Sequence, residues 1–169
     1  MKIYIFSLLI VLFVGTVVSC AKAGSGSAEG MINPGDKIGN FLVTRGGEEG
    51  VTYTWNLDQE CVKQGGVEIY SCKVDLDTNV NVSWGVYAPR GEDLDTLWSE
   101  YTYKMFINDR PVNLEDFASI TVYHPQVGKM RHWNVVIVAN KPGDIIVHSI
   151  GILRGETSED TTTYTFSSP

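Results

Sequence analysis

Bulky apolar and small polar residues alternate along most of the chain after residue 36. The alternation is clearest in three stretches, 51–57, 80–86 and 101–107, where an aliphatic or aromatic side chain occupies every second position. A period of two residues is typical of β-strands that bury one face of an antiparallel sheet. Weaker stretches of the same kind are 41–45, 67–74, 120–123, 133–139, 144–153 and 162–166.

Turn-forming residues separate these stretches. Asn108-Asp109 follows one strand, and both residues tolerate the positive φ of a tight reversal. Pro142-Gly143 has the residue order of a type II turn, which predicts that 133–139 and 144–153 pair as a hairpin.

One short stretch has helical periodicity. Leu94, Leu97 and Trp98 are spaced as i, i+3 and i+4, and Asp93 before them is a suitable N-cap. We expect a short helix that covers one end of the sheets.

About seven to nine strands at this spacing predict an all-β fold, a two-sheet antiparallel β-sandwich. The pattern resembles that of immunoglobulin-like domains, with Trp55, Trp84 and Trp133 filling the space between the sheets. The cysteines differ from those of immunoglobulin domains, because Cys61 and Cys72 are close in sequence and would staple a local hairpin or loop. A closed β-barrel is the alternative architecture.

The first 35 residues have a different composition. Lys2 precedes an apolar run, 3–18, that is shorter than the roughly 20 residues needed to cross a membrane, so it predicts a cleaved signal peptide. A Gly- and Ser-rich spacer, typical of a flexible tether, follows. We therefore expect a signal peptide at 1–19, a tether at 20–35 and one folded domain at 36–169.

The end of the apolar run, Val17-Val18-Ser19-Cys20, resembles the lipobox of bacterial lipoproteins. The resemblance implies that Cys20 becomes the first residue of the mature chain and carries fatty acyl chains such as palmitate. Two or more chains anchor a protein stably, here in a membrane of the cell envelope and facing outside the cytoplasm. A competing A-x-A site, Ala21-Lys22-Ala23, would instead release a soluble chain that begins at Gly24.

The chain has three cysteines. With Cys20 lipidated, Cys61 and Cys72 remain to form a disulfide in the oxidising space outside the cytoplasm. Two free buried thiols are the alternative.

The formal net charge is −7, and no cluster of Lys and Arg offsets it. Nucleic acids and anionic lipid surfaces repel an acidic domain, so we exclude nucleic-acid binding. The acyl chains, rather than basic side chains, are expected to hold the protein at the membrane.

Motifs for catalysis or cofactors are incomplete. The segment Asp75-Leu76-Asp77-Thr78-Asn79 matches the start of a calcium loop, but Val80 and Val86 stand where the motif requires Gly and Glu. The three histidines lack the spacing of a zinc site, and there is no G-x-S-x-G elbow. We expect neither a metal nor a cofactor, and we assign no catalytic residue.

Aromatic residues outside the predicted core phase are the remaining lead. Tyr123, His124, Arg131 and His132 flank the loop 126–129, and aromatic side chains beside an Arg suit contact with a protein or a sugar. The competing interpretation is an edge or a second layer of core.

These features predict a lipid-anchored extracytoplasmic protein that acts as a non-catalytic binding or structural module, with a protein or glycan ligand. A carboxylate-dependent envelope hydrolase or carbohydrate-active protein is the first alternative. A deep cleft with two convergent acids of shifted pKa would favour it. A calcium-stabilised adhesion domain is the second alternative.

Overall fold

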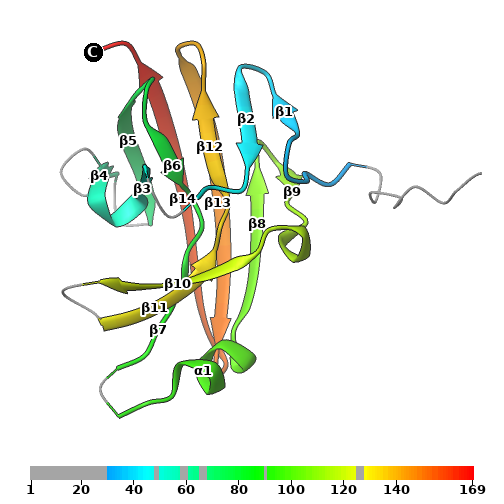
Figure 1. Ribbon diagram of the computed structural model, residues 1–169, viewed down its shortest axis with the longest axis vertical. Coiled ribbons are helices and arrows are strands. Elements are labelled where there is room, and N and C mark those ends of the chain that lie inside the picture. Colours follow the sequence, from blue (N-terminus) through cyan, green and yellow to red (C-terminus); the bar gives the residue numbers. More distant parts are fainter. Residues whose placement is uncertain (1–29, 48–49, 58–60, 65–67, 90, 125–127) are drawn as a thin grey trace, which may run out of the picture.

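Three open β-sheets and one short α-helix make up the described part of the fold (Figure 1). The computed structural model describes residues 30–47, 50–57, 61–64, 68–89, 91–124 and 128–169. The predicted signal peptide, Cys20 and the first part of the tether therefore lie outside the described residues. The sheets do not close on themselves, so the predicted sandwich-like all-β fold is confirmed and the barrel alternative is not.

The largest sheet has six strands. Their order across the sheet is β4 (Cys61–Lys63), β5 (Ile69–Asp75), β14 (Glu156–Ser167), β13 (Gly143–Leu153), β8 (Thr102–Ile107) and β9 (Arg110–Pro111). Neighbouring strands are antiparallel, except that β5 and β14 are parallel. The long pair β13–β14 forms the centre of this sheet.

A five-stranded sheet packs against the six-stranded one. Its order is β1 (Lys37–Ile38), β2 (Phe41–Thr44), β12 (Val136–Ala139), β6 (Asn79–Asn81) and β3 (Val51–Tyr53), with β3 and β6 parallel. Phe41 and Phe166, one from each sheet, have ring centroids 5.5 Å apart. Both sheets contribute to one cluster of buried apolar residues, which includes Val43, Val80, Ile137, Met105, Ile145, Val147 and Tyr164. Removing this apolar surface from water holds the two sheets together.

A third sheet, which the sequence pattern did not predict, crosses beside these two. Its order is β10 (Ser119–His124), β11 (Gly128–Trp133) and β7 (Gly85–Tyr87). The helix α1 (Leu94–Glu100) follows β7 and buries Leu94 and Leu97 against Val86. The predicted cap is confirmed, because Oδ1 of Asp93 accepts a hydrogen bond of 2.9 Å from the Thr96 N–H.

One predicted turn is confirmed and one predicted hairpin is wrong. Asn108 and Asp109 have φ angles of 47° and 63° and join β8 to β9. The turn at Pro142-Gly143 does not pair 133–139 with 144–153. β12 pairs with β2 and β6, whereas β13 pairs with β14 and β8, so this turn carries the chain from one sheet to the other. Turn residues determine where the chain reverses, but they do not determine which strands pair with each other.

The strand predicted at 51–57 is shorter than expected. β3 ends at Tyr53, and the chain continues as a 3₁₀ turn, Thr54–Leu57; a second such turn is Leu114–Asp116. Alternation of apolar and polar residues does not fix where a strand stops, because a 3₁₀ turn can also bury side chains: here Thr54 and Leu57, three residues apart, are both buried.

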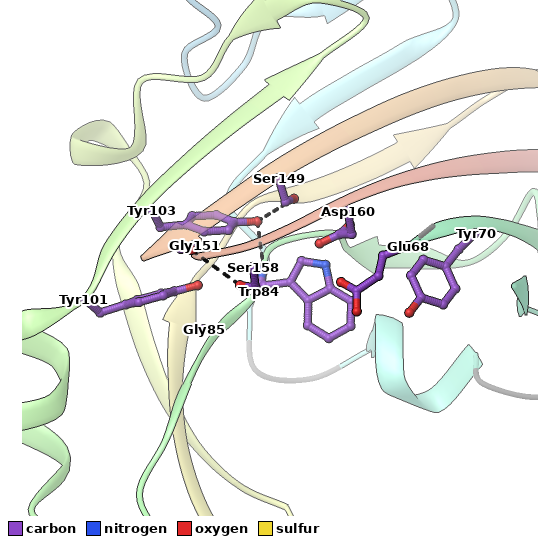
Figure 2. A pocket seen from close by; sticks show the side chains of 10 residues that line it. All are labelled: Glu68, Tyr70, Trp84, Gly85, Tyr101, Tyr103, Ser149, Gly151, Ser158 and Asp160. Atoms are coloured by element: carbon purple, nitrogen blue, oxygen red, sulfur yellow. Dashed lines mark hydrogen bonds between the residues drawn. The ribbon is translucent and has the colours of Figure 1, made fainter. Parts of the chain in front are cut away.

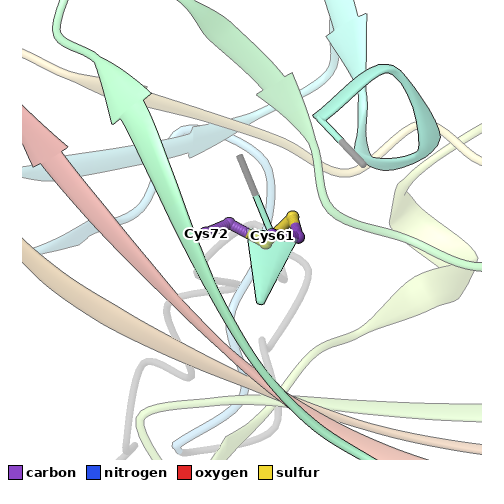
Figure 3. Close-up of a disulfide and its surroundings, with 2 residues drawn as sticks. All are labelled: Cys61 and Cys72. Atoms are coloured by element: carbon purple, nitrogen blue, oxygen red, sulfur yellow. A yellow bond between two sulfur atoms is a disulfide. The ribbon is translucent and has the colours of Figure 1, made fainter. Parts of the chain in front are cut away.

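The predicted disulfide is present at one edge of the six-stranded sheet (Figure 3). Cys61 of β4 lies opposite Cys72 of β5, and their sulfur atoms are 2.03 Å apart. The bond joins two neighbouring strands, as the sequence separation of 11 residues predicted.

Replacing Ile145 by Ala tests the position of the core. Ile145 is fully buried, and losing its side chain there should lower the free energy of unfolding by about 2–5 kcal/mol. Ile146→Ala is a matched control, because this neighbour is 46% exposed and should change stability by about 0.5 kcal/mol or less. Denaturant unfolding measures both, and equal losses would contradict the assigned faces of β13.

Candidate functional site

The inward-facing side chains of β13 and β14 change in size along the pair. At one end they are bulky and apolar, and at the other end they are small or polar. The cross-strand pairs, in order, are Ile145–Tyr164, Val147–Thr162, Ser149–Asp160 and Gly151–Ser158. The small pairs cannot fill the space above the sheet, so the tightly packed core gives way to a hollow.

Adjacent strands extend this small, polar row into the floor of a cleft. Thr162 lies opposite Tyr70 in the parallel pair β5–β14, so Glu68, two residues earlier, comes beside Asp160. Tyr103 of β8 forms the opposite side of the floor. The cleft has a volume of about 270 Å³.

Trp84 stands over this floor. Figure 2 shows its indole at the centre of the cleft, with Asp160 and Glu68 towards its nitrogen and Tyr101 on the other side. The backbone N–H of Trp84 donates a 3.1 Å hydrogen bond to the Tyr103 hydroxyl, which is 2.8 Å from Oγ of Ser149. Trp84 was expected inside the core, but it only packs partly against it and lines the cleft with the rest of its surface.

Buried polar residues fix the chain just before Trp84. Asn81 and Ser83 are the polar residues that alternate with the apolar ones in the stretch 80–86, a pattern that predicts exposure, yet both are about 1% exposed. Ser83 donates from its N–H and from its hydroxyl to Oδ1 of Asn81, over 3.0 and 2.8 Å, and its hydroxyl also contacts the carbonyl of Trp133. Side-chain bonds replace a regular strand ladder here, so they set the angle at which Trp84 leaves the core.

Tyr101 is held by a stack of rings and by a glycine. Its ring lies 5.9 Å from that of Tyr103, and Tyr103 stacks on Trp133 at 5.2 Å. A Cβ on Gly151 would come within 2.7 Å of the Tyr101 hydroxyl oxygen. Gly151 therefore leaves the room in which the Tyr101 ring rests against β13.

Asp160 is the most unusual group in the cleft. Its Oδ1 atom is buried and has no hydrogen-bond partner among the described residues. Burial, with a contribution from the nearby Glu68 carboxyl, raises the pKa of Asp160 to about 6, although the Trp84 indole, His148 and the Thr162 hydroxyl oppose the shift. A carboxylate that is partly withdrawn from solvent favours a ligand that donates hydrogen bonds or carries positive charge.

Two further cavities of about 260 Å³ each adjoin the central one. The first shares Tyr70 and Trp84 with it and reaches the Cys61–Cys72 disulfide and Lys63. The second shares Gly85 and Tyr101 and reaches β7 and Arg154. We call the three together the groove. Its length suits an extended ligand better than a small compact one.

The residues predicted as a contact surface come together only in part. Tyr123 lies opposite Lys129 and Thr121 opposite Arg131, so Tyr123 and Arg131 share one face of the β10–β11 hairpin. Tyr123 is 75% exposed on β10, and the side chain of His124 lies outside the described residues. Arg131 forms an ion pair of 2.7 Å with Asp95 and lies over the Trp98 ring. His132 is fully buried rather than exposed, because it occupies an inward position on β11.

Cys61, Cys72 and the segment that resembles a calcium loop lie outside the central cleft. Cys61 and Cys72 form their disulfide beside the groove, and Cys20 lies outside the described residues. Asp75 and Asn79 end one strand and begin the next, across a turn in which the Thr78 N–H donates to the Asp75 carbonyl. Within the part of the chain that the structure describes, no three His, Cys, Asp or Glu residues are grouped as a metal site.

The sequence did carry one signal for the cleft. Asp160 has the same phase along β14 as the buried Thr162, Tyr164 and Phe166. A carboxyl group at an inward position of a strand is costly unless it serves a purpose. Glu68, Tyr70 and Tyr101 carried no comparable signal, because their neighbourhood depends on strand pairing.

Comparisons with known proteins add little to this geometry. No protein-family model and no curated protein matches the chain. Among solved structures, a cysteine protease inhibitor from Entamoeba histolytica is similar over 69% of this chain and 94% of its own, with 10% identity and a TM-score of 0.34. In the described ranges, no helix has the length and hydrophobicity needed to cross a bilayer.

Replacing Asp160 by Asn should stabilise the protein at neutral pH. Because the pKa of Asp160 is raised in the folded state, its contribution is most favourable below about pH 4 and is lost as the pH rises through about 6. Asn carries no charge to bury, so we expect the free energy of unfolding to rise by about 1–3 kcal/mol at neutral pH and to change little at acidic pH. Thermal unfolding across this range measures it, and a destabilised variant at neutral pH would contradict the assignment.

Proposed function

We propose that the protein is a lipid-anchored binding module of the cell envelope that holds its ligand in the groove. The signal peptide, the lipobox-like Val17-Val18-Ser19-Cys20 and the spacer support the anchor. The all-β body supports a display role, because rigid sheets keep binding residues in a fixed arrangement.

The observation that carries the binding role is the cleft itself. Trp84, Tyr70 and Tyr101 offer partly accessible rings, and Glu68 and Asp160 offer carboxyl groups on the same floor. A concave site with aromatic walls and a few convergent polar groups is the usual form of a ligand site. Trp and Tyr also contribute most of the affinity at many interfaces.

A carboxylate-dependent hydrolase is the second candidate. The raised pKa of Asp160 favours it, since a general acid must keep its proton near neutral pH, and Glu68 is a nearby second carboxyl group. The buried Oδ1 of Asp160 argues for binding instead, because a general acid has to reach the leaving group. Turnover of polysaccharide or peptide substrates that Asp160→Asn and Glu68→Gln each abolish would establish the catalytic role.

Cys20→Ala tests the anchor. If Cys20 is acylated, the variant should lose labelling by a fatty-acid analogue and should no longer be cleaved at Cys20. Membrane fractionation and mass spectrometry of the mature amino terminus measure both effects. A wild-type chain that begins at Gly24 without lipid would overturn the anchor and leave the groove untouched.

Trp84→Ala tests the groove. In a binding screen of peptides and glycans on the full chain in detergent, true ligands should lose about 10-fold or more in affinity, because the central ring is removed. Tyr123→Ala is the control, since it removes an exposed ring outside the groove. Ligands that respond to Tyr123→Ala alone would place the binding surface on β10 and reject the groove. Circular dichroism verifies that both variants fold.

A further inference from the structure

The charged side chains that line the central cavity are acidic. Glu68 and Asp160 line it, and no Lys or Arg is among its described lining residues. Arg154, at the far end of the groove, is already engaged by Glu92 at 3.0 Å and Glu100 at 2.7 Å. The middle of the groove therefore favours a ligand with a positive charge, which the carboxyl groups of Glu68 and Asp160 would attract.

The aromatic rings of this cavity favour the same charge. Trp84 and Tyr70 lie beside the two carboxyl groups, and Tyr101 lines the cavity on the other side of Trp84 (Figure 2). The face of an aromatic ring attracts a cation within about 6 Å of its centroid, most strongly when the cation has lost its water. The chain itself uses this contact at one end of the groove, where Nζ of Lys63 lies 5.8 Å from the centroid of Tyr70.

The backbone of β7 offers a second kind of contact. β7 is the edge strand of its sheet, and the Ala88 N–H donates to the Lys129 carbonyl of β11. Because antiparallel hydrogen bonding alternates from residue to residue, the peptide groups of Gly85 and Tyr87 point away from β11. Both residues line the groove, and a strand edge of this kind can pair with an extended peptide.

These observations together specify a ligand. We propose that the groove binds an extended peptide segment, which adds as a strand to the edge of β7 and places a lysine or arginine side chain in the central cavity between the aromatic rings and the carboxyl groups of Glu68 and Asp160. The proposal rests on the proposed binding function of the groove. It names a basic partner for a chain whose net charge is −7.

The pH dependence of binding follows from the same contacts. Only ionised Asp160 attracts the cation, so affinity should fall as Asp160 gains its proton near pH 6. The other titratable groups that face it are Glu68, His148 and the hydroxyls of Tyr101, Tyr103 and Tyr164. His148 also contacts Glu159 at 2.8 Å, so a His148 variant is included as a control.

The test compares capped pentapeptides that differ at one central residue, using calorimetry on the full chain in detergent. Lysine and norleucine have side chains of similar length, but only lysine is charged. We expect the lysine peptide to bind about 10-fold or more tightly at about pH 8, and its affinity to fall about 10-fold by about pH 5. Asp160→Asn should remove the pH dependence and reduce the preference for lysine, because Glu68 remains, whereas Asp144→Asn, an exposed acid outside the groove, and His148→Gln should retain both differences.

A backbone probe tests strand addition separately. Methylation of the peptide nitrogens on either side of the lysine should weaken binding about 10-fold or more, and the bound parent peptide should slow hydrogen exchange at the Gly85 and Tyr87 amides. Gly151→Ala, which displaces Tyr101, should weaken binding without unfolding the chain.

The outcomes separate the two proposals. Equal binding of lysine and norleucine peptides, or a Trp84-dependent neutral glycan that binds equally at both pH values, would overturn the basic-peptide ligand and leave the binding function standing. If the groove residues respond to no peptide or glycan, both proposals fail.

Discussion

The register of β13 against β14 decides where the core ends and the cleft begins. Ile145 and Val147 meet Tyr164 and Thr162, and the next inward pair is Ser149 with Asp160. A shift of one residue would turn every one of these side chains to the opposite face. The parallel pairing of β5 with β14 then brings in Tyr70, and the pairing of β8 with β13 brings in Tyr103 on the opposite side of the floor.

The core and the cleft are also continuous through shared side chains. Tyr103 is buried, stacks on Trp133 and bonds through its hydroxyl to the backbone of Trp84. Burial raises the pKa of Tyr103, so its hydroxyl remains protonated and able to donate. The position of Trp84 is thereby tied to the interior of the sandwich rather than to a mobile surface loop, and a site held by the core loses less entropy when a ligand binds.

Local signals predicted several individual features of the fold but not the site. The positive φ at Asn108, the cap at Asp93 and the disulfide depend on residues close in sequence, and the pattern predicted them. Partners distant in sequence were not predictable, because alternation shows that a face is buried but not what covers it. For the same reason two positions were predicted wrongly. His132 was expected at the surface but is buried, and Trp84 was expected inside the core but is only partly buried.

The carboxyl group of Asp160 is unfavourable for folding but suits the binding of a cation. Thr162, Tyr164 and Phe166 continue its phase along β14, and packing alone would favour a neutral residue at its position. A buried carboxylate without a counter-charge lowers the stability of the free protein at neutral pH. A bound cation would offset this unfavourable free energy and would therefore bind more tightly. Local violations of folding rules tend to mark functional positions. The proposed site is therefore centred on the residue that folding explains least.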